Sequence, residues 1–378
     1  MNFNAVFMIA LCNMTALRGS KVAVALFAIE LGASPFDIGV VVAMYAVFPA
    51  MLALFAGRLS DRFGTRLPML FGSVGVACGL MLPWLAPRLP ALYASATLIG
   101  ASYVFYHASV QNLVGLLSAS PVERTRSFST YSLVLATGSF SGPLLAGFAI
   151  DHCGHARTYM ILALLPVLPA LIMAASRNVK ADGGGDAAVA GANRVMDLLR
   201  DKPLVRVLIV GGIILTGIDL FQFYMPIYGR SSGLSASAIG VIISMFAAAA
   251  FVVRLVIPAL IARLGDEGLL TIALFIGAAA YFAMPFFTNV AALCAIAFVF
   301  GLGLGLGQPL SVMLTFSRSP RGRSGEALGL RLTINNCTHI AVPLVFGAIG
   351  SFFGLAPVFW TNALLLAGSG IYSCRRPA

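Results

Sequence analysis

The sequence predicts an all-α membrane protein with twelve transmembrane helices in two pseudo-symmetric six-helix bundles. Of its 378 residues, 60% are hydrophobic and only 10% are charged, whereas about a quarter of the residues of a soluble domain are charged. Apolar segments recur along the whole chain, and each is about 20 residues long, which is the length that an α-helix needs to cross a bilayer. The two halves of the chain also align with each other.

The expected spans are joined by short loops, because irregular backbone exposed to lipid would leave its polar groups unsatisfied. The first six spans are residues 4–29, 36–57, 68–87, 91–117, 128–150 and 157–175. The second six are residues 204–228, 237–262, 269–287, 290–316, 327–350 and 355–373. The polar, Gly-rich and Ala-rich segment 176–203 predicts a cytoplasmic linker. The expected domains are therefore an N-terminal bundle (1–175), this linker and a C-terminal bundle (204–378).

The placement of positive charge predicts the orientation. The net charge is +11, but in a membrane protein the distribution of Lys and Arg matters more than their number. Only Arg88, Arg157 and Arg230 fall in loops expected outside. Four further cations fall within spans, namely Arg18, Lys21, Arg254 and Arg331. The positive-inside rule therefore places both termini in the cytoplasm, and we expect a multi-pass monomer of the cytoplasmic membrane with no nucleic-acid partner.

An internal repeat supports the division into halves. Residues 31–64 align without gaps on residues 232–265, and eleven of the 34 positions are identical. A second match, offset by 200, pairs PLLAG from Pro143 with PLVFG from Pro343. Two parallel repeats related by an axis along the membrane normal are an architecture of secondary transporters.

The stretch GRLSDRFGTR, residues 57–66, lies in the loop expected between the second and third spans. It resembles the signature of the major facilitator superfamily, and the residues that match are Gly57, Leu59, Asp61, Arg62, Gly64 and Arg66. The resemblance covers nearly the whole chain and implies a transporter that works by alternating access. It also implies that this loop latches the two halves together by contacting residues 324–328. We expect Gly57 and Gly64 to allow a tight turn there.

The stretch GSFSGPLLAG in the fifth span resembles a Gly-Pro motif of family members that export substrate against protons. Its motif residues are Gly138, Gly142, Pro143 and Gly147. Gly138 and Gly142 form a small-xxx-small surface for close helix packing, and Pro143 is expected to bend the helix. The chain departs from the pattern of drug antiporters at the fourth span, where Ala96 or a neighbour stands in place of their Arg.

Two cations in the first span require a partner, because a central Arg or Lys costs about 2.5 to 3.5 kcal/mol on insertion. Arg18 and Lys21 are three residues apart, which places them on one face of a helix. An offset of 201 aligns Arg18 with Asp219 of the seventh span. In the family that the chain resembles, these two spans face each other across the central cavity.

We therefore expect Asp219 to pair with one of these cations, while the other binds an anionic group of the solute. Asp219 is also the candidate carrier of the coupling proton, because apolar surroundings favour the neutral carboxyl and a nearby cation favours the ionised form. The alternative is a structural ion pair that does not contact the solute.

Other polar side chains of the spans are candidates for solute binding. His107 and Gln111 lie one helical turn apart in the fourth span. The remaining candidates are Gln222, Tyr224, Gln308, Asn335 and Asn336. His339 lies in the same span as the two asparagines, whereas Arg254 and Arg331 are interpreted as cations that snorkel to the membrane surface.

The resulting functional prediction is a secondary transporter of a small, anionic organic solute, coupled to protons and exporting. One alternative is a broad-specificity drug/proton antiporter, in which Arg18, Lys21 and Asp219 serve coupling only. An alternative from another class is a membrane sensor that does not transport. The sequence contains no cluster of nucleophile, base and metal ligands, so we expect no enzyme, no metal and no cofactor besides the proton gradient.

Overall fold

The computed structural model describes residues 3–117, 121–175, 198–319 and 324–374. Within these ranges the regular structure is helical, and twelve helices are long and apolar enough to cross a membrane. The predicted fold class is confirmed. The predicted linker, residues 176–203, lies mostly outside the described residues.

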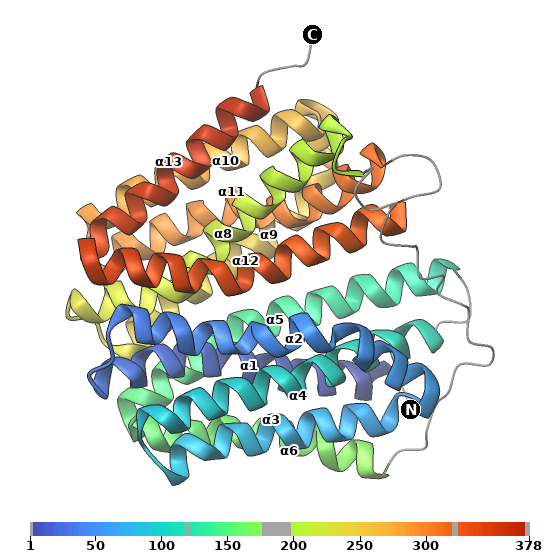
Figure 1. Cartoon of the computed structure of the whole chain (residues 1–378), viewed down its shortest axis with the longest axis vertical. Coiled ribbons are helices and arrows are strands. Elements are labelled where there is room, and N and C mark those ends of the chain that lie inside the picture. The colour runs from blue at the N-terminus through green and yellow to red at the C-terminus, as the bar shows by residue number, and fades with distance from the viewer. Residues whose placement is uncertain (1–2, 118–120, 176–197, 320–323, 375–378) are drawn as a thin grey trace. The chain divides into compact units, whose positions relative to one another are not determined.

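The helices follow the expected spans in order (Figure 1). The first half contains α1 (Phe3–Glu30), α2 (Pro35–Phe63), α3 (Arg66–Leu85), α4 (Leu89–Leu116), α5 (Pro121–Cys153) and α6 (His155–Ala175). The second half contains α8 (Lys202–Ser231), α9 (Ala236–Leu264), α10 (Asp266–Ala283), the 3₁₀ turn η1 (Met284–Phe286), α11 (Val290–Arg318), α12 (Ser324–Phe353) and α13 (Leu355–Cys374). Several helices are longer than the spans, because hydropathy measures the membrane crossing and a helix can continue beyond it.

The signature stretch shows this difference clearly. It was predicted to be a loop, but α2 continues to Phe63, so Gly57 lies inside the helix and not in a turn. The turn is confined to Gly64 and Thr65, and Gly64 has a φ of 82°. Glycine adopts this left-handed conformation without the steric penalty of a side chain. The prediction of a tight turn is therefore confirmed for Gly64 and wrong for Gly57.

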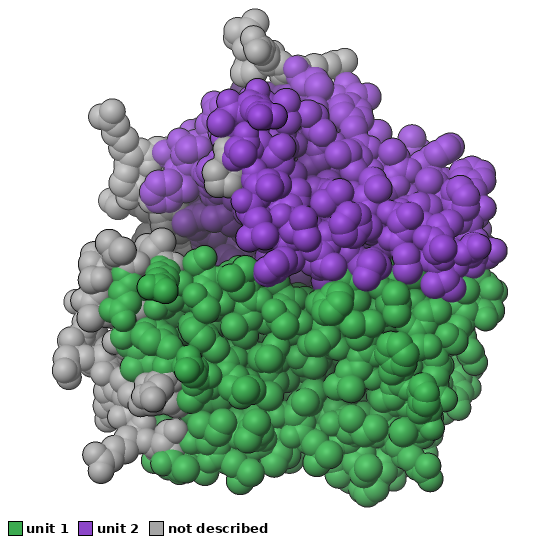
Figure 2. Space-filling model, turned by 180° about the vertical axis from the view of Figure 1, so that it is seen from behind, with its two compact units in different colours: residues 1–185, 226–244 green, residues 186–225, 245–378 purple. Residues whose placement is uncertain are grey.

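The helices form two compact units (Figure 2). Unit 1 comprises residues 1–185 and 226–244, and unit 2 comprises residues 186–225 and 245–378. The end of α8 and the start of α9 thus belong to unit 1, although both helices follow the linker in the sequence. The predicted domain boundaries at 175 and 204 stay a prediction.

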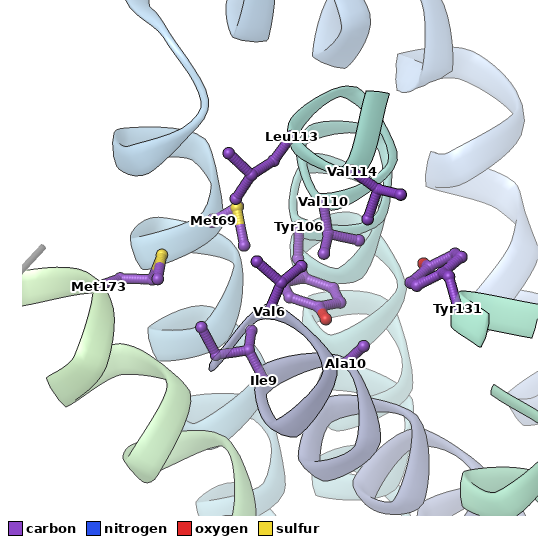
Figure 3. Packing of buried hydrophobic residues seen from close by; sticks show 10 residues of the cluster. All are labelled: Val6, Ile9, Ala10, Met69, Tyr106, Val110, Leu113, Val114, Tyr131 and Met173. Carbon is purple, nitrogen blue, oxygen red and sulfur yellow. The ribbon is translucent and has the colours of Figure 1, made fainter. Parts of the chain in front are cut away.

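In unit 1, α1 packs against α5 and α6, and α4 packs against α2 and α3. Side chains of α1, α3, α4, α5 and α6 meet in a buried core (Figure 3). Its members are Val6, Ile9, Ala10, Met69, Tyr106, Val110, Leu113, Val114, Tyr131 and Met173. This core holds α1 in place, and α1 carries the two cations of the first span.

In unit 2, α11 is packed closely through the glycines of GLGLGLG, residues 301–307. A Cβ atom at Gly301 would lie 2.5 Å from the carbonyl oxygen of Phe246 in α9, and one at Gly307 would lie 2.5 Å from Ile214 in α8. Real Cβ atoms do not approach so closely, so these positions require glycine. α11 is thereby positioned against α8, and both helices carry predicted site residues.

Candidate functional site in the membrane-spanning helices

The α1–α5 contact places Arg18 in unit 1. A Cβ atom at Gly142 would lie 2.7 Å from both the Cβ of Arg18 and the carbonyl oxygen of Thr15. A Cβ atom at Gly138 would lie 2.8 Å from Met14. Because both glycines lack side chains, the two helices approach to backbone contact, as the small-xxx-small spacing predicted. The hydroxyls of Thr15 and Ser141 share a hydrogen bond of 2.9 Å across the same contact.

Arg18 is half-buried and lies near a polar group on α4. It interacts electrostatically with Tyr103 and His107. The ring of His107 stacks on Tyr103 at 5.4 Å between centroids, and Gln111 Nε2 lies 3.4 Å from His107 Nε2. The structure therefore brings together three residues predicted for the site, Arg18, His107 and Gln111. It adds Tyr103, which the spacing to His107 could have indicated, since the two are one turn apart.

Lys21 is also half-buried but reaches a different helix. Its Nζ lies 5.9 Å from the centroid of the Tyr45 ring in α2, within the range of a cation–π contact. The Tyr45 hydroxyl donates to Ser20 Oγ at 3.2 Å. The two cations of α1 therefore lie beside aromatic side chains of different helices, Arg18 beside α4 and Lys21 beside α2.

The other face of the Gly-Pro stretch contacts the segment of α9 that belongs to unit 1. A Cβ at Gly147 would lie 2.4 Å from the carbonyl oxygen of Ala236, and one at Gly240 would lie 2.4 Å from that of Pro143. One turn further along α5, the Asp151 carboxylate accepts hydrogen bonds from the backbone N–H groups of Ala236 (3.0 Å) and Ser237 (2.8 Å). A carboxylate is favourable there, because the N–H groups at a helix start have no partner within the helix.

In unit 2, Asp219 of α8 contacts His339 of α12. Asp219 Oδ2 and His339 Nδ1 form a short ion pair, in which the imidazole N–H donates to the carboxylate. The Asp219 side chain is only 15% exposed, and Tyr281 of α10 interacts with it electrostatically. The predicted pairing of Asp219 with Arg18 or Lys21 joins residues of different units and stays a prediction.

A second polar group in unit 2 joins α11 and α12. Arg331 Nη2 donates to Gln308 Oε1 at 2.6 Å, and Arg331 Nε donates to Ser311 Oγ at 3.3 Å. Arg331 is only 7% exposed. The snorkelling interpretation is therefore wrong for Arg331, because its guanidinium is folded back among the helices. Arg254 is exposed on α9.

The remaining predicted solute-binding residues differ in burial. Gln222, Asn335 and Asn336 are half-buried. Tyr224 is fully buried, with its ring against Phe359 at 5.8 Å between centroids. Contact of these four residues with a solute stays a prediction.

Arg66, the last residue of the signature, binds the end of α6. Its Nε donates to the carbonyl oxygen of Met173 at 2.9 Å, and its Nη2 donates to that of Ala174 at 2.5 Å. Arg206 of α8 does the same in unit 2, where its Nη2 donates to the carbonyl oxygens of Tyr372 and Ser373 in α13. Both cations satisfy carbonyl groups that a helix end leaves without partners.

The predicted latch depends on side chains outside the described ones. These include the side chains of Asp61 and Arg62 and those of residues 324–326. The latch therefore stays a prediction. Among the described residues, no group of three or more His, Cys, Asp and Glu side chains could hold a metal ion.

The described residues form twelve helices that could span a membrane, and the ionisable side chains inside them are typical of a multi-pass membrane transporter. The sequence model of the Major Facilitator Superfamily matches residues 6–337. The chain belongs to this superfamily.

Curated relatives and solved structures agree with this assignment. The multidrug resistance protein MdtG of Klebsiella pneumoniae (strain 342) is 24% identical over 351 residues, which cover 90% of this chain and 84% of MdtG. The class B tetracycline resistance protein of Escherichia coli is 23% identical over 348 residues, covering 88% and 83% of the two chains. The nucleoside transporter NupG has the same fold, with a TM-score of 0.83, 14% identity and complete coverage of both chains. A POT family transporter solved with 5-aminolevulinic acid gives a TM-score of 0.81 at 12% identity, covering 98% and 94%.

Proposed function

We propose that this chain is a proton-coupled exporter of a small organic solute that bears a negative charge, and that it works in the cytoplasmic membrane as a monomer with both termini inside. The observation that carries the coupling is the Asp219–His339 pair. Both side chains can change their charge, and both are placed on spanning helices where a charge is costly without a partner.

The coupling follows from this pair. Protonation of Asp219 neutralises the carboxylate and weakens its attraction to His339. The ion pair stabilises any arrangement of α8 and α12 in which the two side chains touch. Loss of the contact therefore shifts the equilibrium toward arrangements in which they are apart. Alternating access requires such a bias, because the proton must favour one orientation of the transporter over the other.

The negative charge of the solute is supported by unit 1. Arg18 and Lys21 are half-buried cations within a spanning helix, and Tyr103, His107 and Tyr45 lie beside them. Such a surface suits an anionic group attached to an aromatic or apolar body.

The direction of transport is supported by the names of the relatives, which are resistance proteins, and by the Gly-Pro stretch.

A second candidate is a broad-specificity drug/proton antiporter. The multidrug name of the MdtG relatives favours it. In that case Arg18, Lys21 and Asp219 serve coupling, and neutral or cationic aromatic solutes are exported as well as anions.

The test is solute flux in proteoliposomes under an imposed pH gradient, comparing wild type with Asp219→Asn. We expect proton-driven flux to fall at least about tenfold in the variant, since the asparagine cannot take up the proton. Glu267→Gln is the matched control, because Glu267 is an exposed carboxylate of the same unit. Full proton-driven flux in Asp219→Asn would refute the proton role.

The same assay separates the other readings. Equal flux of anionic and cationic aromatic solutes would favour the drug antiporter. A correctly folded wild type that moves no solute at all would favour the membrane sensor.

A further inference from the structure

A buried arginine in unit 2 has bonding capacity that its neighbours leave unused. Arg331 makes two hydrogen bonds, to Gln308 Oε1 and to Ser311 Oγ. Both partners are neutral, and no carboxylate among the described side chains pairs with this guanidinium. Burying a charge without a charged partner is unfavourable, and neutral oxygens offset only part of this cost.

The two existing bonds leave one edge of the guanidinium available. A guanidinium has five N–H donors in a rigid plane. Nε and Nη2 are held by Ser311 and Gln308, whereas Nη1 makes no hydrogen bond with the described residues. The edge formed by Nη1 and Nη2 matches the two oxygens of a carboxylate, which arginine binds in a bidentate manner.

Gln308 adds a second donor beside this edge. Its Oε1 accepts from Arg331, which fixes the orientation of the amide, because the opposite orientation would bring two donors together. Its Nε2 is buried and makes no hydrogen bond with the described residues. A buried cation and a buried N–H donor side by side both require an acceptor, and an anionic oxygen satisfies both.

The position of the guanidinium is determined by three helices. A Cβ at Gly211 of α8 would lie 2.2 Å from Ser311 Oγ of α11, so glycine is needed for the hydroxyl to occupy this place. Ser311 then holds Nε of Arg331 on α12. At the position equivalent to Arg331, unit 1 has Tyr131 of α5, which is neutral. The cation is therefore present only in the second half, and the internal repeat does not account for it.

We infer that Arg331, positioned by Gln308 and Ser311, binds the carboxylate of the transported solute. This inference rests on the proposed function, and it names the group of unit 2 that recognises the charge of the solute. Arg331 thereby determines specificity for anions over neutral molecules of the same shape.

The test uses pairs of molecules that differ only in charge, benzoate with benzamide and salicylate with salicylamide. Their apparent affinities are measured from ligand-dependent thermal stabilisation of the purified full-length protein, and their flux is measured in proteoliposomes. Wild type is expected to prefer the carboxylate. Arg331→Gln is expected to lose about tenfold in carboxylate affinity without a change for the amide. Arg331→Lys retains the charge and is expected to lose less. Arg254→Gln, which removes an exposed cation of the same unit, is the matched control.

Gln308→Glu distinguishes binding from a purely structural role of Arg331. This variant supplies Arg331 with a carboxylate of its own, so the protein without ligand should be more thermostable while the preference for carboxylates disappears. If Arg331 has only a structural role, Gln308→Glu should gain the stability and keep the preference for carboxylates. The Gln308→Glu variant also provides a test if Arg331→Gln does not fold.

The outcomes separate this inference from the proposed function. A wild type that transports the carboxylates, together with Arg331→Gln and Gln308→Glu variants that still prefer them, would overturn the inference and leave the function standing. A wild type that moves neither member of either pair under a pH gradient would count against the proposed function for these solutes, and the role of Arg331 would fall with it.

Discussion

The helix pairs α1–α5 and α8–α12 occupy equivalent places in the two repeats, yet they are held together differently. In unit 1 the contact is made by the backbone, since Gly138 and Gly142 lie against α1. In unit 2 the equivalent residues are Thr338 and Val342, and the contact includes the Asp219–His339 ion pair. Near its start, α12 also packs on α8 through apolar side chains, with Ala327 in their core.

The repeat therefore duplicates the helix pair without duplicating the contact that holds it together. Helices that meet at glycines approach closely, so few side-chain atoms separate their backbones. At the equivalent positions α12 keeps the side chains of Thr338 and Val342, and a carboxylate and an imidazole meet between α8 and α12. We therefore expect the α1–α5 contact to be the stable one and the α8–α12 contact to respond to protons. Four experiments, from the largest expected effect to the smallest, test this comparison.

Gly142→Val gives α5 the side chain that α12 has at the equivalent position. We expect the free energy of unfolding to fall by about 3 kcal/mol, because the new Cβ would overlap Arg18 and the backbone of Thr15. The measurement is the denaturation midpoint of the purified protein. Gly329→Val is the control, since no atom lies within 4 Å of a Cβ at Gly329. Equal stability of the two variants would contradict the close packing.

His339→Gln removes the titratable partner of Asp219 and keeps a hydrogen-bond donor. We expect proton-driven flux to fall about tenfold, equivalent to about 1.4 kcal/mol, with little change in thermal stability. Flux in proteoliposomes with and without a pH gradient measures this effect. His152→Gln, an exposed histidine, should transport normally. Unchanged coupling in His339→Gln would mean that the pair is only structural.

Arg66→Met and Arg206→Met remove similar contacts at the ends of α6 and α13, which are made from α3 in unit 1 and from α8 in unit 2. Each is expected to lower the free energy of unfolding by about 1 kcal/mol, because carbonyl groups at a helix end lose a cationic donor. Urea denaturation of the two variants gives this comparison directly. A large loss for one variant and none for the other would show that only one of the two helix ends depends on its arginine.

Thr15→Val removes a hydrogen bond across the α1–α5 contact. A double-mutant cycle with Ser141→Ala should give a coupling energy of about 0.6 kcal/mol, the average for polar contacts between membrane helices. The equivalent Thr216 bonds to the carbonyl oxygen of Gly212 in its own helix at 2.9 Å, so Thr216→Val should show no coupling to α12. Coupling between Thr216 and Thr338 would remove this distinction between the halves.

The sequence by itself determined the twelve spans, the repeat and the close approach at Gly138 and Gly142. These properties depend on residue types within a window of about 20 residues or on a regular spacing, and local composition is enough to read them. It also indicated Arg18, His107 and Gln111 as site candidates, which the structure brings together, while their contact with a solute stays a prediction.

Only the tertiary structure decided which of these side chains meet. Asp219 and His339 are 120 residues apart, and Arg331 and Gln308 are 23 apart on different helices, so no local pattern pairs them. The snorkelling assigned to Arg331 was wrong for the same reason: the direction of a long side chain depends on the neighbours that pack around it. Hydropathy measures how far a helix crosses the membrane, whereas packing determines where the helix ends and which partners its polar groups find.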